Sequence, residues 1–136
     1  MATTKEKTEK YIEAIGRRKT AIARVRLTSA AKNNFKINER TLVSYFPTEE
    51  LRKIAEDALN KAKNGGFNVS AHIKGGGIHS QAEALRHGVS RALVKHDEAL
   101  KAKLKSAGFL KRDPRAKERR KFGLKKARKA PQWSKR

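Results

Sequence analysis

The stretch FNVSAHIKGGGIHSQAEALRHGVSRALVKH, residues Phe67 to His96, joins a strand pattern to a helix pattern across three glycines. From Phe67 to Ile73 apolar residues alternate with polar ones, which is typical of a strand with one buried face. From Ile78 to Leu93 the apolar residues recur every three or four positions, which predicts an amphipathic helix over 78–96. We therefore expect this helix to supply the core of the domain.

Two segments before this stretch carry strand patterns. In TAIARVRL, residues Thr20 to Leu27, every second residue is apolar, and the residues between them are Ile22 and two arginines. We therefore expect strand structure within 11–27. FKIN, residues Phe35 to Asn38, predicts a second short strand with Phe35 and Ile37 inward. A polar turn at Asn38 and Glu39 should follow it.

Helix signatures complete the order of elements. PTEELRKIAEDALN, residues Pro47 to Asn60, has Thr48 as a helix N-cap and two glutamates in the first turn, and NGG at 64–66 should end this helix. Asp97 can cap a further helix through Ser106, which Gly108 would end. Strands, helix, strand, helix and helix in this order predict an α+β fold, a two-layer domain with a mixed sheet and helices on one face.

The C-terminal segment has a different character. Residues 111–136 hold thirteen Lys or Arg against Asp113 and Glu118, so half of the chain's net charge of +22 lies in its last 26 residues. Their few large apolar residues have no helical or strand spacing. Ordering such a segment costs about 1–2 kcal/mol per residue, and a polyanion such as nucleic acid is the commonest partner that offsets this cost. The alternative is a solvated basic tail that binds nothing specific.

Length and composition allow one domain. We expect a flexible polar N-terminus at 1–10, an α+β RNA-binding domain at 11–110 and an extended basic tail at 111–136. The chain has no cysteine, which fits a reducing compartment. No stretch is apolar enough to serve as a leader or a membrane span, so we expect a cytoplasmic protein.

A second basic patch lies near the start of the domain. In GRRKTAIARVR we expect a turn at Arg17, Arg18 and Lys19, with Arg24 and Arg26 on the exposed side of the following strand. Arginine offers a planar fork for phosphate and lysine a point charge, so the mixture suits an RNA backbone. The alternative is a solvated strand face. In the tail, Trp133 could stack on a base or ribose, or anchor the tail in a crevice.

Other candidate sites are weaker. Gly75, Gly76 and Gly77 lie between a strand and a helix N-terminus and form a possible phosphate loop, although the stretch matches neither the Walker pattern nor the dinucleotide fingerprint. His79, Glu83 and His87 share one helix face, but a solvated face explains them better than a metal site. We expect no catalytic residues, no metal and no cofactor.

Three segments together resemble a known family. GRRKTAIARV, then GGG followed by QAEALRHGVSRAL, then GFLKRDPRAKERRKFGLKKARKAPQWSKR are similar to the bacterial form of ribosomal protein number nine of the small subunit. The resemblance covers nearly the whole chain from Tyr11. It implies an α+β domain of the ribosomal left-handed βαβ type.

The resemblance also implies partners. They are the 16S-type ribosomal RNA of the subunit head, neighbouring head proteins and the anticodon stem-loop of peptidyl-site tRNA, which Ser134, Lys135 and Arg136 would approach. The protein would be a structural, ribosome-associated constituent that supports translation. The expected ribosomal RNA contacts are Arg17, Arg18, Lys19, Arg24, Arg112, Arg115, Arg119, Arg120, Lys121, Lys125, Lys126, Arg128 and Lys129.

Two other functions explain part of the sequence. A nucleoid-type DNA-binding protein would account for the charge, but it would not account for a structured domain followed by a tail that ends on Lys-Arg. A phosphate-handling enzyme using the glycine loop would need a nearby acid or base, and Glu83 is the only obvious carboxylate.

Overall fold

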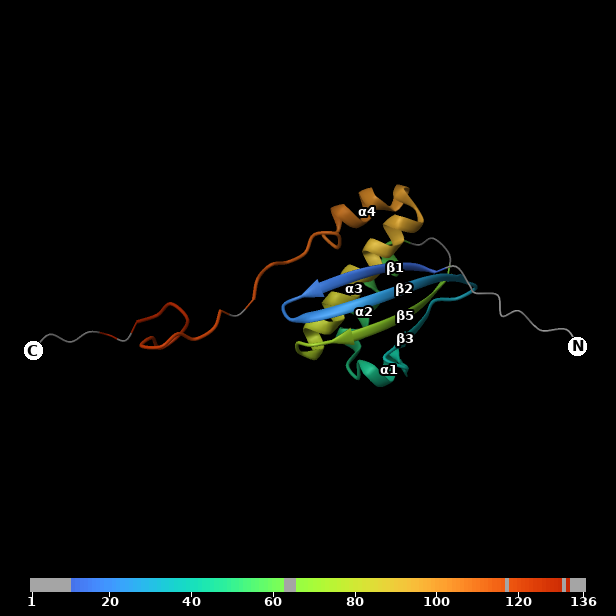
Figure 1. The fold of residues 1–136 in the computed structure, drawn as a ribbon. Coiled ribbons are helices and arrows are strands. Elements are labelled where there is room, and N and C mark those ends of the chain that lie inside the picture. Colours follow the sequence, from blue (N-terminus) through green and yellow to red (C-terminus); the bar gives the residue numbers. More distant parts are fainter. Residues whose placement is uncertain (1–10, 63–65, 117, 131, 133–136) are drawn as a thin grey trace, which may run out of the picture.

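The computed structural model describes residues 11–62, 66–116, 118–130 and 132. Its elements follow the chain from the blue to the orange part of Figure 1. The strands are β1 (Ile12–Arg18), β2 (Ala21–Ala30), β3 (Asn34–Ile37), β4 (Arg40–Thr41) and β5 (Gly66–Lys74). The helices are α1 (Leu42–Tyr45), α2 (Glu49–Ala62), α3 (Ile78–His96), the 3-10 turn η1 (Glu98–Leu100) and α4 (Lys101–Ser106).

The five strands form one mixed sheet in the order β1-β2-β5-β3-β4. β3 runs parallel to β5, and the other neighbouring pairs are antiparallel. In the central register Val25 of β2 lies between Ala14 of β1 and Ala71 of β5. All three side chains are buried, so this register places the apolar set of each strand on the same face of the sheet.

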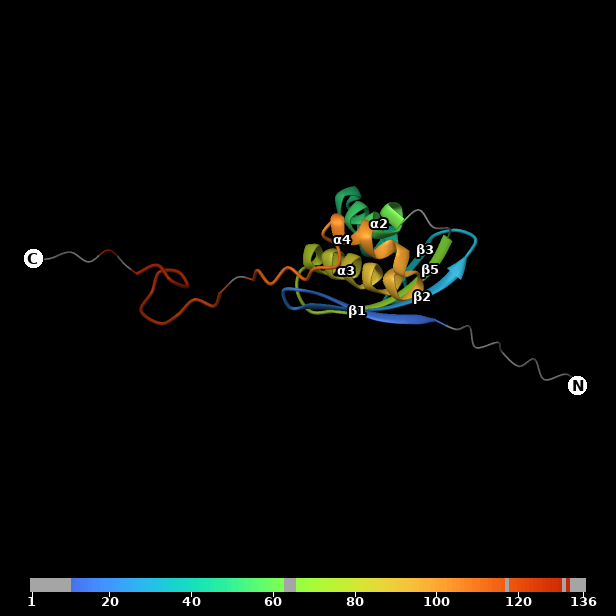
Figure 2. The same ribbon diagram turned by 90° about the horizontal axis from the view of Figure 1, so that it is seen from above.

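Among the described residues, the helices pack on this apolar face. Figure 2 shows α2, α3 and α4 on one side of the sheet. The core between the layers includes Leu27, Ile37, Leu85 and Leu93, which are at most 2% exposed. The fold is therefore α+β in two layers, as the order of elements predicts.

Most of the expected elements are confirmed. The strand alternation in β2 and β5 matches their burial, and the helix predicted over 78–96 has these bounds in α3. The turn at Asn38 and Glu39 is confirmed, with φ of 46° and 66°. The predicted end of the earlier helix at 64–66 lies partly outside the described residues, and α2 ends at Ala62.

Three details differ from the sequence-based expectation. Ile78 was expected on the core stripe, but it is 44% exposed because it begins α3 at the end of the glycine loop. The Asp97 side chain accepts a hydrogen bond from the Ala99 N–H and so caps η1, with α4 following directly. The short elements β4 and α1 were not expected, since two and four residues are too few to show a period.

Two glycines allow α3 to lie against β1. An ideal Cβ on Gly16 would lie 1.9 Å from the Ala84 carbonyl oxygen and 2.2 Å from the Gly88 nitrogen. A Cβ on Gly88 would lie 2.7 Å from a methyl carbon of Val25. The strand and the helix therefore touch through their backbones, which only glycine permits at both positions.

Candidate nucleic-acid interface

The face of the sheet that no described helix covers is rich in cations. We call it the open face, and on the described strands it carries five cations and one acid. The cations are Arg17, Arg24, Arg26, Lys36 and Lys74, and the acid is Glu13. This excess of positive charge suits a polyanion.

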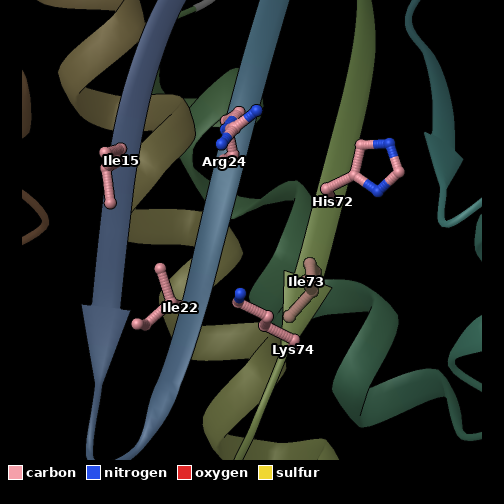
Figure 3. A pocket seen from close by; sticks show the side chains of 6 residues that line it. All are labelled: Ile15, Ile22, Arg24, His72, Ile73 and Lys74. Atoms are coloured by element: carbon pink, nitrogen blue, oxygen red, sulfur yellow. The ribbon is translucent and has the colours of Figure 1, made fainter.

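Cross-strand register fixes how these side chains are grouped. Arg24 of β2 lies between Ile15 of β1 and His72 of β5. In the next row Ile22 lies between Arg17 and Lys74. Figure 3 looks onto this part of the open face, with the helices behind the strands.

The single acid of the open face is only loosely paired. Glu13 lies 3.5 Å from Arg24 and 3.9 Å from Arg26, and the two arginine side chains are 58% and 46% exposed. The Arg26 guanidinium also lies 4.5 Å from the centre of the Tyr11 ring. Exposed ion pairs of this kind contribute about 0–1 kcal/mol, so both arginines can exchange Glu13 for another anion at low cost.

A polar stripe of α3 lies along the free edge of β1. Lys95 donates to the Glu13 carbonyl at 2.8 Å, Arg91 donates to the Ile15 carbonyl at 2.7 Å, and His87 Nδ1 accepts from the Arg17 N–H at 3.2 Å. We call these three contacts the edge ladder. Four helical residues rise about 6 Å and two strand residues about 6.6 Å, so the two spacings match. The ladder satisfies backbone groups that an edge strand otherwise presents for pairing.

The same stripe explains the His79, Glu83 and His87 spacing. Glu83 accepts a 2.6 Å hydrogen bond from Arg18, while His87 bridges β1 and the chain after α4. Within the described ranges no group of three His, Cys, Asp or Glu could hold a metal ion. Glu83 and His87 join the strand edge, α3 and the beginning of the tail, so the expected solvated face is wrong for these two residues. The His79 side chain is 59% exposed and lies 3.8 Å from Glu83.

Residues Phe109–Arg115, the tail root, are bound to the domain. Arg18 Nη1 donates to the Arg115 carbonyl at 2.6 Å and lies 3.5 Å from Asp113, while its Nε donates to Glu83. Only 13% of the Arg18 side chain is exposed. Because Arg18 links β1, α3 and the tail root, it differs from the exposed arginines of the open face.

Two further contacts hold the tail root. The Arg86 guanidinium lies 4.8 Å from the centre of the Phe109 ring, and His87 Nε2 lies 3.2 Å from the Leu110 carbonyl. Since His87 Nδ1 accepts from Arg17, these partners select a neutral imidazole with its proton on Nε2. Burial lowers the pKa of His87, the charges of Arg91 and Arg112 lower it further, and the Leu110 carbonyl opposes them.

Charge pairs also organise the described tail residues. Hydrogen bonds from Arg115, and its charge, hold the pKa of Asp113 well below its usual range. Glu118 accepts from Lys121 and from Arg128, and these hydrogen bonds lower its pKa. Beyond Leu110 the described tail contains turns and bends without helix or strand. Exposed cations there are Lys111, Arg112, Arg115, Arg119, Arg120, Lys121, Lys125, Lys126, Arg128 and Lys129.

The glycines of the loop 75–77 differ in their surroundings. Gly75 and Gly76 have φ of 80° and 67°, and a Cβ on Gly75 would lie 2.5 Å from the Thr20 carbonyl oxygen. They therefore permit a close turn against the β1–β2 connection. Gly77 faces open space at the N-terminus of α3, which has no side-chain cap.

The expected basic residues divide into three groups. The expected turn is wrong for Arg17 and Arg18, which end β1, and Lys19 lies in the turn that follows. Arg17 and Arg24 lie on the open face, Arg18 contacts the tail root, and the tail cations are exposed. Trp133, Ser134, Lys135 and Arg136 lie outside the described residues. Arg26 lies on the same face as Arg24, as the strand alternation predicts. The sequence alone does not single out Lys36 and Lys74, although alternation places them on this face too.

An α+β domain with an uncovered cationic sheet face and a cation-rich tail defines a class of nucleic-acid-binding protein. The family described as ribosomal protein S9/S16 matches residues 16–136, and the chain belongs to this family. It is a non-enzymatic family of structural ribosomal constituents that bind ribosomal RNA, with ribosomal RNA and other ribosomal proteins as partners. No helix in the part of the chain that the structure describes is long and apolar enough to span a membrane.

Proposed function

We propose that this protein binds the 16S-type ribosomal RNA of the small-subunit head in cytoplasmic ribosomes. We further propose that Ser134, Lys135 and Arg136 reach the anticodon stem-loop of peptidyl-site tRNA. The distribution of charge carries this proposal, since residues 111–136 hold half of the net charge of +22. The ten exposed tail cations named above lie among described residues that form no helix or strand, where RNA along the tail would neutralise them.

The domain contributes its own contacts to this proposal. Arg17, Lys19 and Arg24 are exposed and would meet RNA phosphates directly. Arg18 and Arg115 would act at the tail root, where they join the tail to the domain beside the RNA. The uncapped α3 N-terminus behind Gly75–Gly77 would add backbone N–H donors for phosphate.

Two features of the architecture belong to the same proposal. The connection from β3 through α2 to the parallel strand β5 would be a left-handed βαβ crossover, as the family resemblance implies. The domain would comprise residues 11–110 and the tail residues 111–136, with the tail root tied back to α3. Neighbouring proteins of the subunit head would complete its surroundings.

Sucrose-gradient sedimentation of three forms of the chain tests this function. The full chain should remain with the small subunit at high salt. A chain ending at Leu110 should dissociate at moderate salt, because it lacks thirteen cations of the tail. A chain lacking only 134–136 should remain bound to the subunit, yet it should lower the affinity of the subunit for peptidyl-site tRNA.

Two controls separate the parts of the proposal. Lys135→Gln with Arg136→Gln keeps the chain length and should reproduce the tRNA defect if charge causes it. Unchanged tRNA affinity in both tip variants would overturn the tRNA contact alone. Normal retention of the chain ending at Leu110 would overturn the role of the tail in RNA binding, and recovery with chromosomal DNA would favour a nucleoid function.

A further inference from the structure

The open face contains a hollow in addition to its positive charge. A depression of about 490 Å³ is lined by Ile15, Ile22, Arg24, His72, Ile73 and Lys74. Its residues come from β1, β2 and β5, and Figure 3 shows them gathered around the middle strand. Sites for small organic ligands usually measure about 300–1,000 Å³, so the hollow has the size for one nucleotide.

The lining combines two chemical characters. Ile15 is 38% exposed although it is a large apolar residue, and Ile22 on the neighbouring strand is partly exposed. Arg24 lies directly beside Ile15 in register, and Lys74 lies directly beside Ile22. An apolar floor beside two cations suits a ligand with a flat apolar part and a negative part.

A nucleotide of single-stranded RNA has these two parts. Bases that leave the helical stack bind on aromatic and apolar side chains, and the His72 ring lies beside the apolar floor of this hollow. The phosphate on either side of the base would meet Arg24 or Lys74. A protein partner would need several acids to match the five cations of this face, whereas RNA supplies one charge per nucleotide.

We propose that this hollow binds one unpaired nucleotide of ribosomal RNA, with its base against Ile15 and Ile22 and its phosphates on Arg24 and Lys74. This inference rests on the proposed RNA-binding function and specifies a site within it. His72 forms the side wall of the hollow. When RNA binds, Arg24 exchanges Glu13 for a phosphate, because the Arg24–Glu13 ion pair is exposed and its atoms lie 3.5 Å apart.

Chemical footprinting of small-subunit ribosomal RNA with the full chain tests the apolar part of the site. The wild-type chain should protect at least one unpaired base. Ile15→Ser with Ile22→Ser should remove that protection and leave the tail-dependent protections in place. The matched control is Val43→Ser on α1, which removes an exposed apolar side chain (60% exposed) outside the sheet and should change no protection.

The salt dependence of RNA affinity tests the charged part. Arg24→Gln with Lys74→Gln should reduce the slope of log affinity against log salt by about 1.4–1.8, because each phosphate contact contributes roughly 0.7–0.9. The control is Lys53→Gln with Lys101→Gln, which removes the same charge from exposed helix positions and should leave the slope unchanged. If Ile15→Ser with Ile22→Ser unfolds at a lower denaturant concentration than the wild type, the variant Arg24→Gln with Lys74→Gln decides the test.

Each outcome decides the inference. Loss of one base protection together with the reduced slope supports it. If both double variants retain the base protection, the inference is overturned. It is also overturned if these variants keep every base protection but no longer bind a neighbouring protein. If the wild-type chain binds no ribosomal RNA, then the proposed function fails as well, and this result is distinct from failure of the hollow alone.

Discussion

Single residues in this protein matter most where two backbones meet. Gly16 of β1 lies against Ala84 and Gly88 of α3, and the atoms nearest to an added Cβ belong to the helix backbone. Backbone atoms cannot rotate away as a side chain can. The position therefore tolerates no side chain unless α3 moves away from the sheet.

We expect Gly16→Ala to lower the free energy of unfolding by roughly 1–3 kcal/mol, the usual cost of overpacking. Urea denaturation of the purified chain measures it. Gly77→Ala is the matched control, because a Cβ there meets no atom within 4 Å and φ is −86°. The control should change stability by no more than about 0.5 kcal/mol, and an equal loss in both variants would contradict the close-contact explanation.

At the scale of elements, the edge ladder ties α3 to β1 through residues that sequence alone does not connect. His87 is its only titratable ring, and it faces the Arg17 N–H, the Leu110 carbonyl and the charges of Arg91 and Arg112. Neutral His87 accepts a hydrogen bond from β1 and donates one to the tail root. Protonation would place a second N–H against the Arg17 N–H and so disrupt the contact between α3 and β1.

This geometry gives a pH prediction. Because the pKa of His87 is lowered in the folded chain, the unfolded chain binds the proton more readily. The contribution of neutral His87 to the free energy of unfolding is fully present above the pKa of about 6.5 that histidine has in the unfolded chain. It is lost as the pH falls from there towards the lower pKa of His87 in the folded chain. Unfolding curves from about pH 7.5 to 5 should therefore show a smaller pH dependence for His87→Gln than for the wild type.

His87→Gln keeps an acceptor and a donor but does not titrate, and the other three histidines are common to both chains. Their contribution therefore cancels in the comparison. Identical pH profiles for the two chains would show that His87 is protonated equally well in the folded and unfolded states.

The elements also show what the sequence could predict. β2, β5 and α3 were predictable because each is long enough to repeat its apolar period several times. The edge ladder was not, since its partners are separated by 70 to 82 positions along the chain. The polar stripe on α3 was visible as a spacing, but its partner strand could be identified only from the fold.

For the whole molecule, the contacts between domain and tail extend to the end of the tail root. Phe109, Leu110, Asp113 and Arg115 contact β1 or α3. Among described residues 118–130, the hydrogen bonds and ion pairs join tail residues to one another. Charge alone marked the change at 111, whereas the contacts with the domain continue to Arg115.

Two truncations test this boundary. A chain ending at Ala116 should unfold at the same denaturant concentration as the full chain, since it keeps every contact of the tail root. A chain ending at Gly108 should lose about 1–3 kcal/mol, the usual range when a few such contacts are removed. Equal destabilisation of both chains would show that residues after 116 also support the domain.

The edge ladder has a consequence for the order in which the chain is made. β1 is synthesised early, yet its Glu13 carbonyl receives its partner only when Lys95, 82 residues later, has been added. Local hairpin pairing with β2 can form before that point, but closure of the domain waits for α3. The tail is translated after α3 and α4, so the nascent chain can complete its globular part before this highly charged segment leaves the exit tunnel.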